Sequence, residues 1–133
     1  MSIKLLDQTF SQFIRLSQTD ENGFGRCISC NKPCFYDNLD AGHFVNRKHM
    51  SLKFSEINVN IQCRQCNRFD EGNIPGYSIG LIKKHGSDIV TKLLAQKHQT
   101  TKFTAFEIKE FIKYYRAKNK QLASDKTFKI NLK

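Results

Sequence analysis

The chain has 133 residues, 39% of them hydrophobic, and carries a formal net charge of +10 from 22 Lys and Arg against 12 Asp and Glu. This length fits a single domain, and no stretch approaches the roughly 18 consecutive apolar residues that predict a membrane span. The first residues, Met1 to Asp7, lack the apolar run and the cleavage signal of a secretory leader, which predicts an intracellular, cytoplasmic protein.

The positive charge is concentrated in the second half of the chain. Residues 77–133 contain thirteen basic and four acidic side chains, whereas residues 1–76 contain nine basic and eight acidic ones. A one-sided basic region is typical of proteins that bind a polyanion such as DNA. The alternative is a solvated, lysine-rich surface that only aids solubility.

The first half of the chain combines one helix with short extended segments. Apolar residues recur at helical spacing over residues 3–18 and predict an amphipathic helix. Residues 26–34 are expected to turn between short strands, and residues 40–47 to form a strand or hairpin arm. Residues 48–58 read as a polar loop, and residues 59–62 as a short extended run. A helix is expected from near Cys66 to a break around Gly72.

Helices dominate the second half. The first is predicted over Ser78–Lys84, and Ser87 is expected to cap the second, whose apolar face begins at Ile89. Thr104 and Glu107 have the spacing of a capping box, which predicts a third helix through about residue 120.

The sequence also suggests how the chain is organised. The last ten residues, from Ser124, are polar and basic and are expected to be frayed or disordered. We therefore expect residues 1–86 to form a core that includes the N-terminal helix. Residues 87–133 would be a basic helical extension packed on that core.

Two Cys-x-x-Cys pairs, Cys27/Cys30 and Cys63/Cys66, are the strongest motif. A two-residue spacer lets both sulfurs of a pair face one ion, and four thiolates make a closed structural zinc site. A redox pair is the alternative. Cys34 follows Cys30 by four residues and could replace one of the ligands.

His43 lies between the two pairs, in the segment Asp-Ala-Gly-His, and is the candidate general base. A neutral imidazole can take a proton from water near pH 7 and so generate the nucleophile for attack on a phosphodiester. The alternative is an ordinary surface or core histidine. Gly42 would allow a phosphate to approach the backbone closely.

Oxygen-bearing side chains near His43 could hold a hard divalent cation. Asp40 is the nearest carboxylate, and Asn67 follows the second cysteine pair directly. On a regular strand, however, Asp40 and His43 point to opposite faces, so a bend at Gly42 would be needed to bring them together. Asn58 could anchor the loop and orient His43, or simply form a turn. His49 is a further candidate ligand.

Basic residues surround this constellation and recur on the last predicted helix. They could neutralise DNA phosphates or stabilise the charge of a transition state, although exposed helix faces often look alike. The candidate DNA-binding residues are Arg47, Lys48, Lys53, Arg64, Arg68, Lys113, Arg116, Lys118 and Lys120.

These motifs resemble a known family. The segments Cys27-Ile-Ser-Cys30, Ala41-Gly-His-Phe-Val-Asn-Arg-Lys-His-Met50 and Gln62-Cys-Arg-Gln-Cys-Asn-Arg-Phe-Asp-Glu-Gly-Asn73 are similar to those of the NinG/Rap family of lambda-type phage recombination endonucleases. The order of the cysteines, His43, Asn58 and Asn67 also resembles the HNH, or His-Me finger, nucleases. The layout is similar to that of phage endonuclease VII.

The resemblance implies an α+β fold with a zinc-bound treble-clef ββα-metal core, HNH-like, flanked by N- and C-terminal helices. It implies a structure-specific DNA endonuclease that cuts Holliday junctions and D-loops by metal-dependent phosphodiester hydrolysis. Catalytic Mg²⁺, replaceable by Mn²⁺, would accompany the structural Zn²⁺. His43, Asn58, Asn67 and Asp40 would be the catalytic residues, and the protein would act in the cytoplasm of a bacterial host.

Two other classes of function remain open at this point. The chain could be a non-catalytic zinc module that binds DNA during phage recombination, which the basic second half supports. It could also be a zinc-organised adaptor for other proteins. An enzyme that makes paired cuts in branched DNA benefits from two active sites, which favours a homodimer. No membrane partner is expected.

Overall fold

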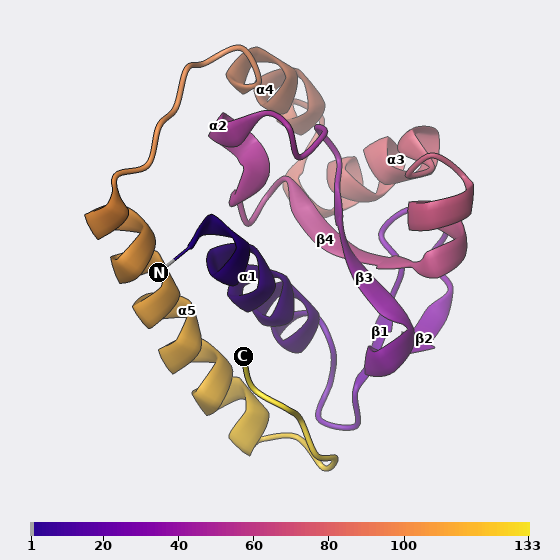
Figure 1. Cartoon of the computed structure of the whole chain (residues 1–133). Coiled ribbons are helices and arrows are strands. Elements are labelled where there is room, and N and C mark those ends of the chain that lie inside the picture. Colours follow the sequence, from indigo (N-terminus) through magenta and orange to yellow (C-terminus); the bar gives the residue numbers. More distant parts are fainter. Residues whose placement is uncertain (1) are drawn as a thin grey trace.

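The structure, a computed structural model, describes residues 2–133 of the chain. It begins with helix α1 (Ile3–Ser17), which matches the helix predicted from the apolar spacing. Ser2 caps its first turn, because the Ser2 hydroxyl oxygen accepts a hydrogen bond from Leu5 N at 3.1 Å. Helix α1 lies between helix α5 on one side and a β-hairpin on the other (Figure 1). The core therefore forms around α1.

Two antiparallel hairpins follow α1. Strand β1 (Phe24–Arg26) pairs with β2 (Pro33–Phe35), and β3 (Leu39–His43) pairs with β4 (Val59–Cys63). Within the second hairpin, Leu39 lies opposite Cys63 and His43 lies opposite Val59. The mixed α+β class predicted from the sequence is confirmed.

Short helical turns connect these strands. Turn η1 (Tyr36–Asn38) leads from β2 into β3, and η2 (Gln65–Phe69) follows β4 directly. Helix α2 (Met50–Lys53) lies in the connection between β3 and β4, which the sequence indicated only as a polar loop. This one-turn helix is too short to leave a periodic apolar pattern, which explains why it was missed.

Strand β4 is buried on both faces, and its two faces differ in character. Val59 and Ile61 pack against α1 in the main core. On the opposite face, Asn60 and Gln62 are fully buried, and the preceding residue, Asn58, is fully buried as well. Buried amides of this kind need hydrogen-bond partners, and these residues hold the surrounding loops together.

Three helices complete the chain: α3 (Ile74–His85), α4 (Ile89–Gln96) and α5 (Ala105–Ser124). Helices α3 and α4 contribute Tyr77, Leu81 and Leu93 to a second apolar cluster that also contains Phe44 and Leu52. Helix α5 returns to pack on α1 (Figure 1). No helix within residues 2–133 is both long enough and apolar enough to cross a membrane.

The helix boundaries agree with the sequence in one case and differ in two. The predicted capping box is confirmed, since Thr104 and Glu107 exchange hydrogen bonds with each other's backbone N–H at 3.0 and 3.1 Å. Helix α3 begins four residues earlier than predicted, because Asn73 caps it. The predicted cap at Ser87 is wrong: the residue before α4 is Asp88, whose side chain makes no capping hydrogen bond.

The segment after α5 differs from the expected frayed tail. It has no regular secondary structure, but it runs back across the end of α1. Lys126 Nζ donates to the carbonyl oxygens of Leu16, Thr19 and Asp20 at 2.9, 2.8 and 3.0 Å. The Phe128 ring lies 5.0 Å from the Phe35 ring, measured between centroids. A polar, basic composition concealed these anchors.

Candidate metal centre and nucleic-acid interface

The two Cys-x-x-Cys pairs meet in space. The sulfur atoms of Cys27, Cys30, Cys63 and Cys66 all lie within 4.8 Å of one another, and those of Cys30 and Cys63 are 3.7 Å apart. Tetrahedral zinc with Zn–S bonds of about 2.3 Å would separate its sulfur ligands by about 3.8 Å. The four side chains therefore fit one zinc ion. Cys34 packs against this group but is not part of it.

Protein groups around the cysteines favour bound, ionised sulfur. Cys66 N donates to the Cys63 sulfur, and Asn73 Nδ2 to the Cys66 sulfur, both at 3.4 Å. Burial raises the pKa of Cys66 to about 12. Burial also opposes ionisation of Cys27, but hydrogen bonds from the backbone of Cys63, Cys30 and Ser29 outweigh it and lower the pKa of Cys27. A cation is needed to keep all four sulfurs ionised together.

The cysteine cluster joins parts of the chain that would otherwise be separate. Cys27 and Cys30 lie in the turn between β1 and β2, whereas Cys63 ends β4 and Cys66 lies in η2. Ile28 N also donates to Ile61 O at 3.0 Å, which ties the first turn to β4. A zinc ion here would fix the position of η2, and with it Asn67, relative to β3.

A hollow of about 360 Å³ follows the edge of β3, between α1 and η2. Arginines outnumber carboxylates in its lining, so its formal charge is positive. The lining residues are Ser11, Arg15, Asp37, Leu39, Asp40, Ala41, Arg47, Arg64, Asn67 and Arg68. We call this hollow the arginine groove. Two of the predicted site residues, Asp40 and Asn67, line it.

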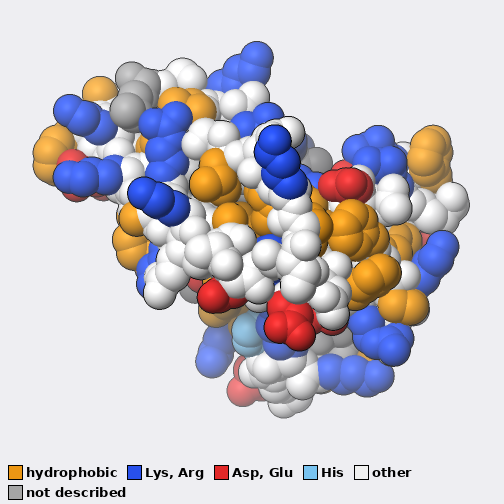
Figure 2. All heavy atoms as spheres, turned by 90° about the horizontal axis from the view of Figure 1, so that it is seen from below, with side chains coloured by type: hydrophobic (Ala, Val, Ile, Leu, Met, Phe, Trp, Pro, Cys, Tyr) orange, Lys and Arg blue, Asp and Glu red, His pale blue; other side chains and the backbone are white. Residues whose placement is uncertain are grey.

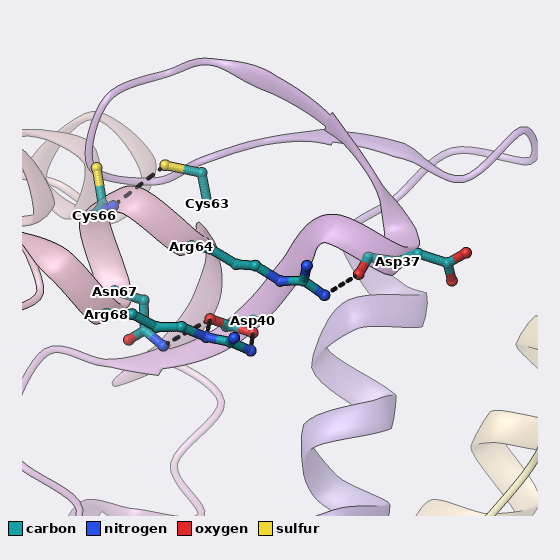
Figure 3. A network of polar contacts seen from close by, with 7 residues as sticks. All are labelled: Asp37, Asp40, Cys63, Arg64, Cys66, Asn67 and Arg68. Carbon is teal, nitrogen blue, oxygen red and sulfur yellow. Dashed lines mark hydrogen bonds and ion pairs between the residues drawn. The ribbon is translucent and has the colours of Figure 1, made fainter.

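Short polar contacts hold the arginines in place. Arg64 Nη2 donates to the carbonyl oxygen of Asp37 at 2.6 Å, as Figure 3 shows. Arg15 Nη2 donates to the Tyr36 carbonyl oxygen at 2.8 Å, and its guanidinium lies 4.0 Å from the centre of the Tyr36 ring. Arg47 forms an ion pair with Asp7 on α1. The guanidinium groups are therefore pre-positioned around the groove.

Asp40 lies inside this groove and is already paired. Arg68 donates to both of its carboxylate oxygens at 2.9 Å, and Asn67 Nδ2 donates to Oδ2 at 3.1 Å (Figure 3). The Asp40 carboxylate correspondingly raises the pKa of the exposed Arg68 guanidinium. The structure thus brings together Asp40 and Asn67, the two predicted Mg²⁺ ligands, but places a competing cation on the carboxylate.

Gln62 adds a third oxygen to this face of the hairpin. It is the cross-strand partner of Asp40, and its Nε2 donates to Ser29 Oγ at 2.7 Å and to Gly72 O at 2.8 Å. Its own Oε1 is buried and has no hydrogen-bond partner among residues 2–133. Oxygen donors from Asp40, Asn67 and Gln62 are the type that Mg²⁺ prefers, so the residues fit this ion once Arg68 has moved away.

Gly42 serves a different purpose from the predicted one. A Cβ atom at this position would lie 1.7 Å from Gln62 Oε1 and 3.0 Å from Asn67 Oδ1. Protein side chains, rather than a phosphate, therefore occupy the space above this glycine. Its lack of a side chain lets the Gln62 and Asn67 amides reach the strand.

His43 is held by the loop between β3 and β4. Its Nε2 atom lies 2.9 Å from the carbonyl oxygen of Lys53. Because a carbonyl can only accept, Nε2 must carry the proton, which leaves Nδ1 with a free lone pair. Burial lowers the pKa of His43 below its usual 6.5, and it outweighs the hydrogen bond to the Lys53 carbonyl group, which raises the pKa. The charge of Arg47 lowers it further. The neutral, proton-accepting form is thus favoured at pH 7.

Asn58 fixes the loop that provides this carbonyl group. It is fully buried. Its Nδ2 donates to Val45 O and Leu52 O at 3.0 and 3.1 Å, and its Oδ1 accepts from Val45 N at 2.8 Å. Asn58 therefore closes the loop immediately before Lys53. The sequence allowed Asn58 to be either an anchor for the loop or a simple turn residue, and these hydrogen bonds are those of an anchor.

The structure does not bring His43 and Asp40 onto one face. Strand β3 keeps its pairing with β4 from Leu39 through His43, so the bend that would unite the two side chains is absent. They point to opposite faces of the hairpin. Ala41, on the same face as His43, lines the arginine groove together with Arg47. His43 does not itself line the groove, but it lies close enough to Arg47, which does, for the Arg47 charge to lower its pKa.

The remaining predicted residues fall into separate regions. His49 lies away from the arginine groove, in a hollow that it lines with Phe44, Ile74 and Leu94. Lys48 is exposed, and the Lys53 ammonium lies 5.7 Å from the centre of the Phe54 ring. The basic residues of α5 are exposed: Lys113, Arg116, Lys118 and Lys120. Figure 2 shows Lys and Arg side chains spread around hydrophobic ones on the face seen there.

Sequence reasoning missed two residues of this site. Arg15 belongs to α1, far from the motifs in sequence, and no local pattern connects it with them. Gln62 could have been found, because polar residues at 58, 60 and 62 alternate with apolar ones in a short strand. Amide side chains at every second position of a buried strand lie on one face, and they indicate an internal hydrogen-bonded network.

Comparison with known proteins identifies the family. The family described as "Bacteriophage Lambda NinG protein" matches residues 2–125, and the chain therefore belongs to the NinG family. The match includes α4 and α5, beyond the region that carries the motifs. No solved structure matches this chain.

Individual relatives agree with this assignment. Protein ninG of Escherichia phage lambda is 30% identical over 126 residues, which cover 94% of this chain and 59% of the relative. Protein ninG of Salmonella phage P22 shows the same identity and coverage, and that of Escherichia phage 933W is 29% identical over 126 residues, covering 94% and 60%. The chain spans about 60% of the length of the curated relatives it matches.

Proposed function

We propose that this NinG-family protein is a DNA endonuclease that hydrolyses phosphodiester bonds in branched recombination intermediates, such as Holliday junctions and D-loops, with the help of a divalent cation. One observation carries the proposal: the Lys53 carbonyl group fixes the His43 imidazole in a proton-accepting tautomer, near Arg47, which lines the arginine groove.

His43 would act as the general base. With Nε2 protonated and bound to Lys53 O, the free Nδ1 atom can take a proton from a water molecule as that water attacks phosphorus. The lowered pKa keeps the ring neutral at physiological pH. Asn58 would contribute indirectly, because it holds the loop that ends at Lys53.

The arginine groove would bind the DNA backbone. Arg15, Arg47, Arg64 and Arg68 line it from α1, the loop after β3, and the η2 region. Guanidinium groups bind phosphate through two parallel hydrogen bonds and stabilise the negative charge that develops as the phosphodiester is cleaved. Because these contacts involve phosphate and not bases, they favour recognition of DNA shape over sequence.

Asp40 and Asn67, with Gln62 beside them, would hold Mg²⁺, and Mn²⁺ would substitute for it. When bound, such an ion would neutralise the charge of a DNA phosphate at the Asp40 end of the groove. Arg68 must first release the Asp40 carboxylate. A DNA phosphate is the natural replacement partner for Arg68, so DNA in the groove would prepare the carboxylate for its cation. The four-cysteine site has no open position and would be structural only.

The test is cleavage of a labelled four-way junction and a matched linear duplex in Mg²⁺, in Mn²⁺ or in EDTA. The wild type and the control His98→Ala, at an exposed histidine far from His43 in sequence, should cut near the branch when a divalent cation is present. His43→Ala should bind the junction, retain zinc and give no product. Cleavage by His43→Ala at the wild-type rate would exclude His43 as the base.

The competing candidate is a zinc module that binds DNA without cutting it. The observation in its favour is the Asp40 carboxylate, which is already paired with Arg68 and points to the opposite face of the hairpin from His43. Binding of Mn²⁺ to the zinc-loaded protein, followed by electron paramagnetic resonance, separates the two. The nuclease predicts that Arg68→Ala tightens Mn²⁺ binding in the absence of DNA and that Asp40→Asn abolishes it. The binding module predicts no specific Mn²⁺ site in either variant.

A further inference from the structure

Helix α5 presents three different faces along its length. The first packs against the core and consists of Ile108, Ile112, Tyr115 and Asn119. The second is a basic stripe at positions i, i+4, i+7 and i+11, made of Lys109, Lys113, Arg116 and Lys120. The third has the same spacing and consists of Glu107, Phe111, Tyr114 and Lys118. We call this third face the mixed stripe.

The mixed stripe exposes aromatic side chains that nothing within residues 2–133 covers. Tyr114 is 50% exposed, Phe111 is 37% exposed and the neighbouring Phe106 is 70% exposed. Together with Glu107, Glu110 and Tyr115, these rings line a hollow of about 420 Å³. Exposed aromatic residues around a hollow are typical of a surface that binds another protein.

The order of residues along the mixed stripe is self-complementary. An acid lies at its N-terminal end, a lysine at its C-terminal end, and two aromatic residues lie between them. Over eleven residues the stripe is about 16 Å long, at 1.5 Å per residue. A second identical stripe that runs in the opposite direction would place acid opposite lysine at both ends, with the aromatic rings in the middle.

We propose that the mixed stripe of α5 is a homodimer interface and that its occupant is the same stripe of a second copy. The twofold axis passes between Ile112 and Lys113, so that Glu107 faces the partner's Lys118 and Phe111 faces the partner's Tyr114. Such an isologous contact closes on itself and stops at two copies. The aromatic rings of each copy fill the hollow of the other.

Charge favours a second copy over nucleic acid as the occupant. Glu107 and Glu110 border the aromatic rings and would repel a phosphate backbone. The basic stripe lies about 160° away around the helix, by the 100° advance of each residue. Dimerisation through the mixed stripe therefore leaves the basic stripes of both copies free for DNA.

Sedimentation velocity over a range of protein concentrations tests the interface. The wild type should convert from monomer to dimer as concentration rises. Tyr114→Glu places a charge at the centre of the contact and should raise the dimer dissociation constant at least about tenfold, as expected for a central aromatic residue. The control Lys109→Glu, on the basic stripe of the same helix, should associate like the wild type. Circular dichroism establishes that each variant is folded.

A charge exchange tests the proposed register. Glu107→Lys and Lys118→Glu each place like charges opposite one another and should weaken self-association. An equimolar mixture of the two variants restores both opposite-charge pairs and should form a heterodimer. In Glu107→Lys the backbone N–H of residue 107 still donates to Thr104, so half of the helix cap is kept.

Two results would overturn the interface. One is a wild type that stays monomeric at the highest concentration, which would assign the aromatic rings to a different protein. The other is a Tyr114→Glu variant that dimerises as tightly as the wild type. A mixture that fails to form the heterodimer would refute the antiparallel register. None of these results depends on nuclease activity, so the interface and the proposed function can fail separately.

Discussion

Asn58→Ala is the most informative single change, because this buried side chain connects the fold with the candidate base. The substitution removes the three hydrogen bonds that tie Val45 and Leu52 together. It should destabilise the protein and release the Lys53 carbonyl group from His43. Both effects follow from one amide, which belongs neither to the cysteine cluster nor to the lining of the arginine groove.

The size of the effect follows from the groups that lose their partner. Val45 N, Val45 O and Leu52 O would each be left without the Asn58 amide in a buried region. An unsatisfied buried polar group costs about 1–3 kcal/mol. Because water can enter part of the cavity, we expect a loss of about 3–5 kcal/mol in the free energy of unfolding. For a chain of this size, the melting temperature should fall by about 10 °C or more.

The assay is chemical denaturation of zinc-loaded protein, with zinc content measured in parallel. The matched control is Asn46→Ala, at an exposed asparagine in the same loop whose Oδ1 accepts one local hydrogen bond, from Lys48 N at 2.9 Å. Asn46→Ala should cost less than about 1 kcal/mol. If Asn58→Ala costs no more than Asn46→Ala, the anchoring role of Asn58 is refuted.

Three other predictions concern zinc, Gly42 and pH. Cys63→Ser removes one of four clustered sulfurs and should abolish both zinc binding and cooperative unfolding. Cys34→Ser changes a cysteine outside the cluster, and elemental analysis should still find one zinc ion per chain. Gly42→Ala forces the buried Gln62 amide to move and should lower the free energy of unfolding by about 1–3 kcal/mol. In a double-mutant cycle, adding Gln62→Ala should recover part of this loss. Strict additivity of the two substitutions would contradict the contact between Gly42 and Gln62. Because the pKa of His43 is lowered from 6.5, the stability that its neutral ring contributes is fully present above that value. This stability should be lost as pH falls through the lowered pKa, so His43→Gln should flatten the pH dependence of unfolding below about pH 6.5. An unchanged slope would show that His43 does not cause it.

The sequence predicted the parts of the fold that rest on local chemistry. Apolar residues at helical spacing located α1, and the Thr104–Glu107 pair located the start of α5. The Cys-x-x-Cys spacing predicted a four-sulfur cluster, which the structure contains. In each case the signal lies within a few residues of the feature that it predicts, or depends on a ligand geometry that few arrangements satisfy.

Long-range contacts could not be predicted in this way. The Asp40–Arg68 pair depends on how η2 approaches β3, and Arg15 reaches the groove only because α1 packs beside it. The tail after α5 is anchored by Lys126 and Phe128, whose partners lie more than 90 residues earlier in the chain. Composition suggested disorder there, because it counts charges without showing where each side chain finds a partner.

The β3–β4 hairpin also explains why the cysteine cluster and the candidate base are far apart. Cys63 lies opposite Leu39 at one end, and His43 lies opposite Val59 at the other, four residue steps or about 13 Å along the strand. The four-cysteine cluster lies at the end next to Asn67, Arg68 and Asp40, and a bound zinc ion would hold that end. Asn58 holds the end next to His43. Zinc loss should therefore weaken both DNA binding and cation binding. Asn58→Ala with zinc retained should keep junction binding while slowing cleavage, which separates the two ends by experiment.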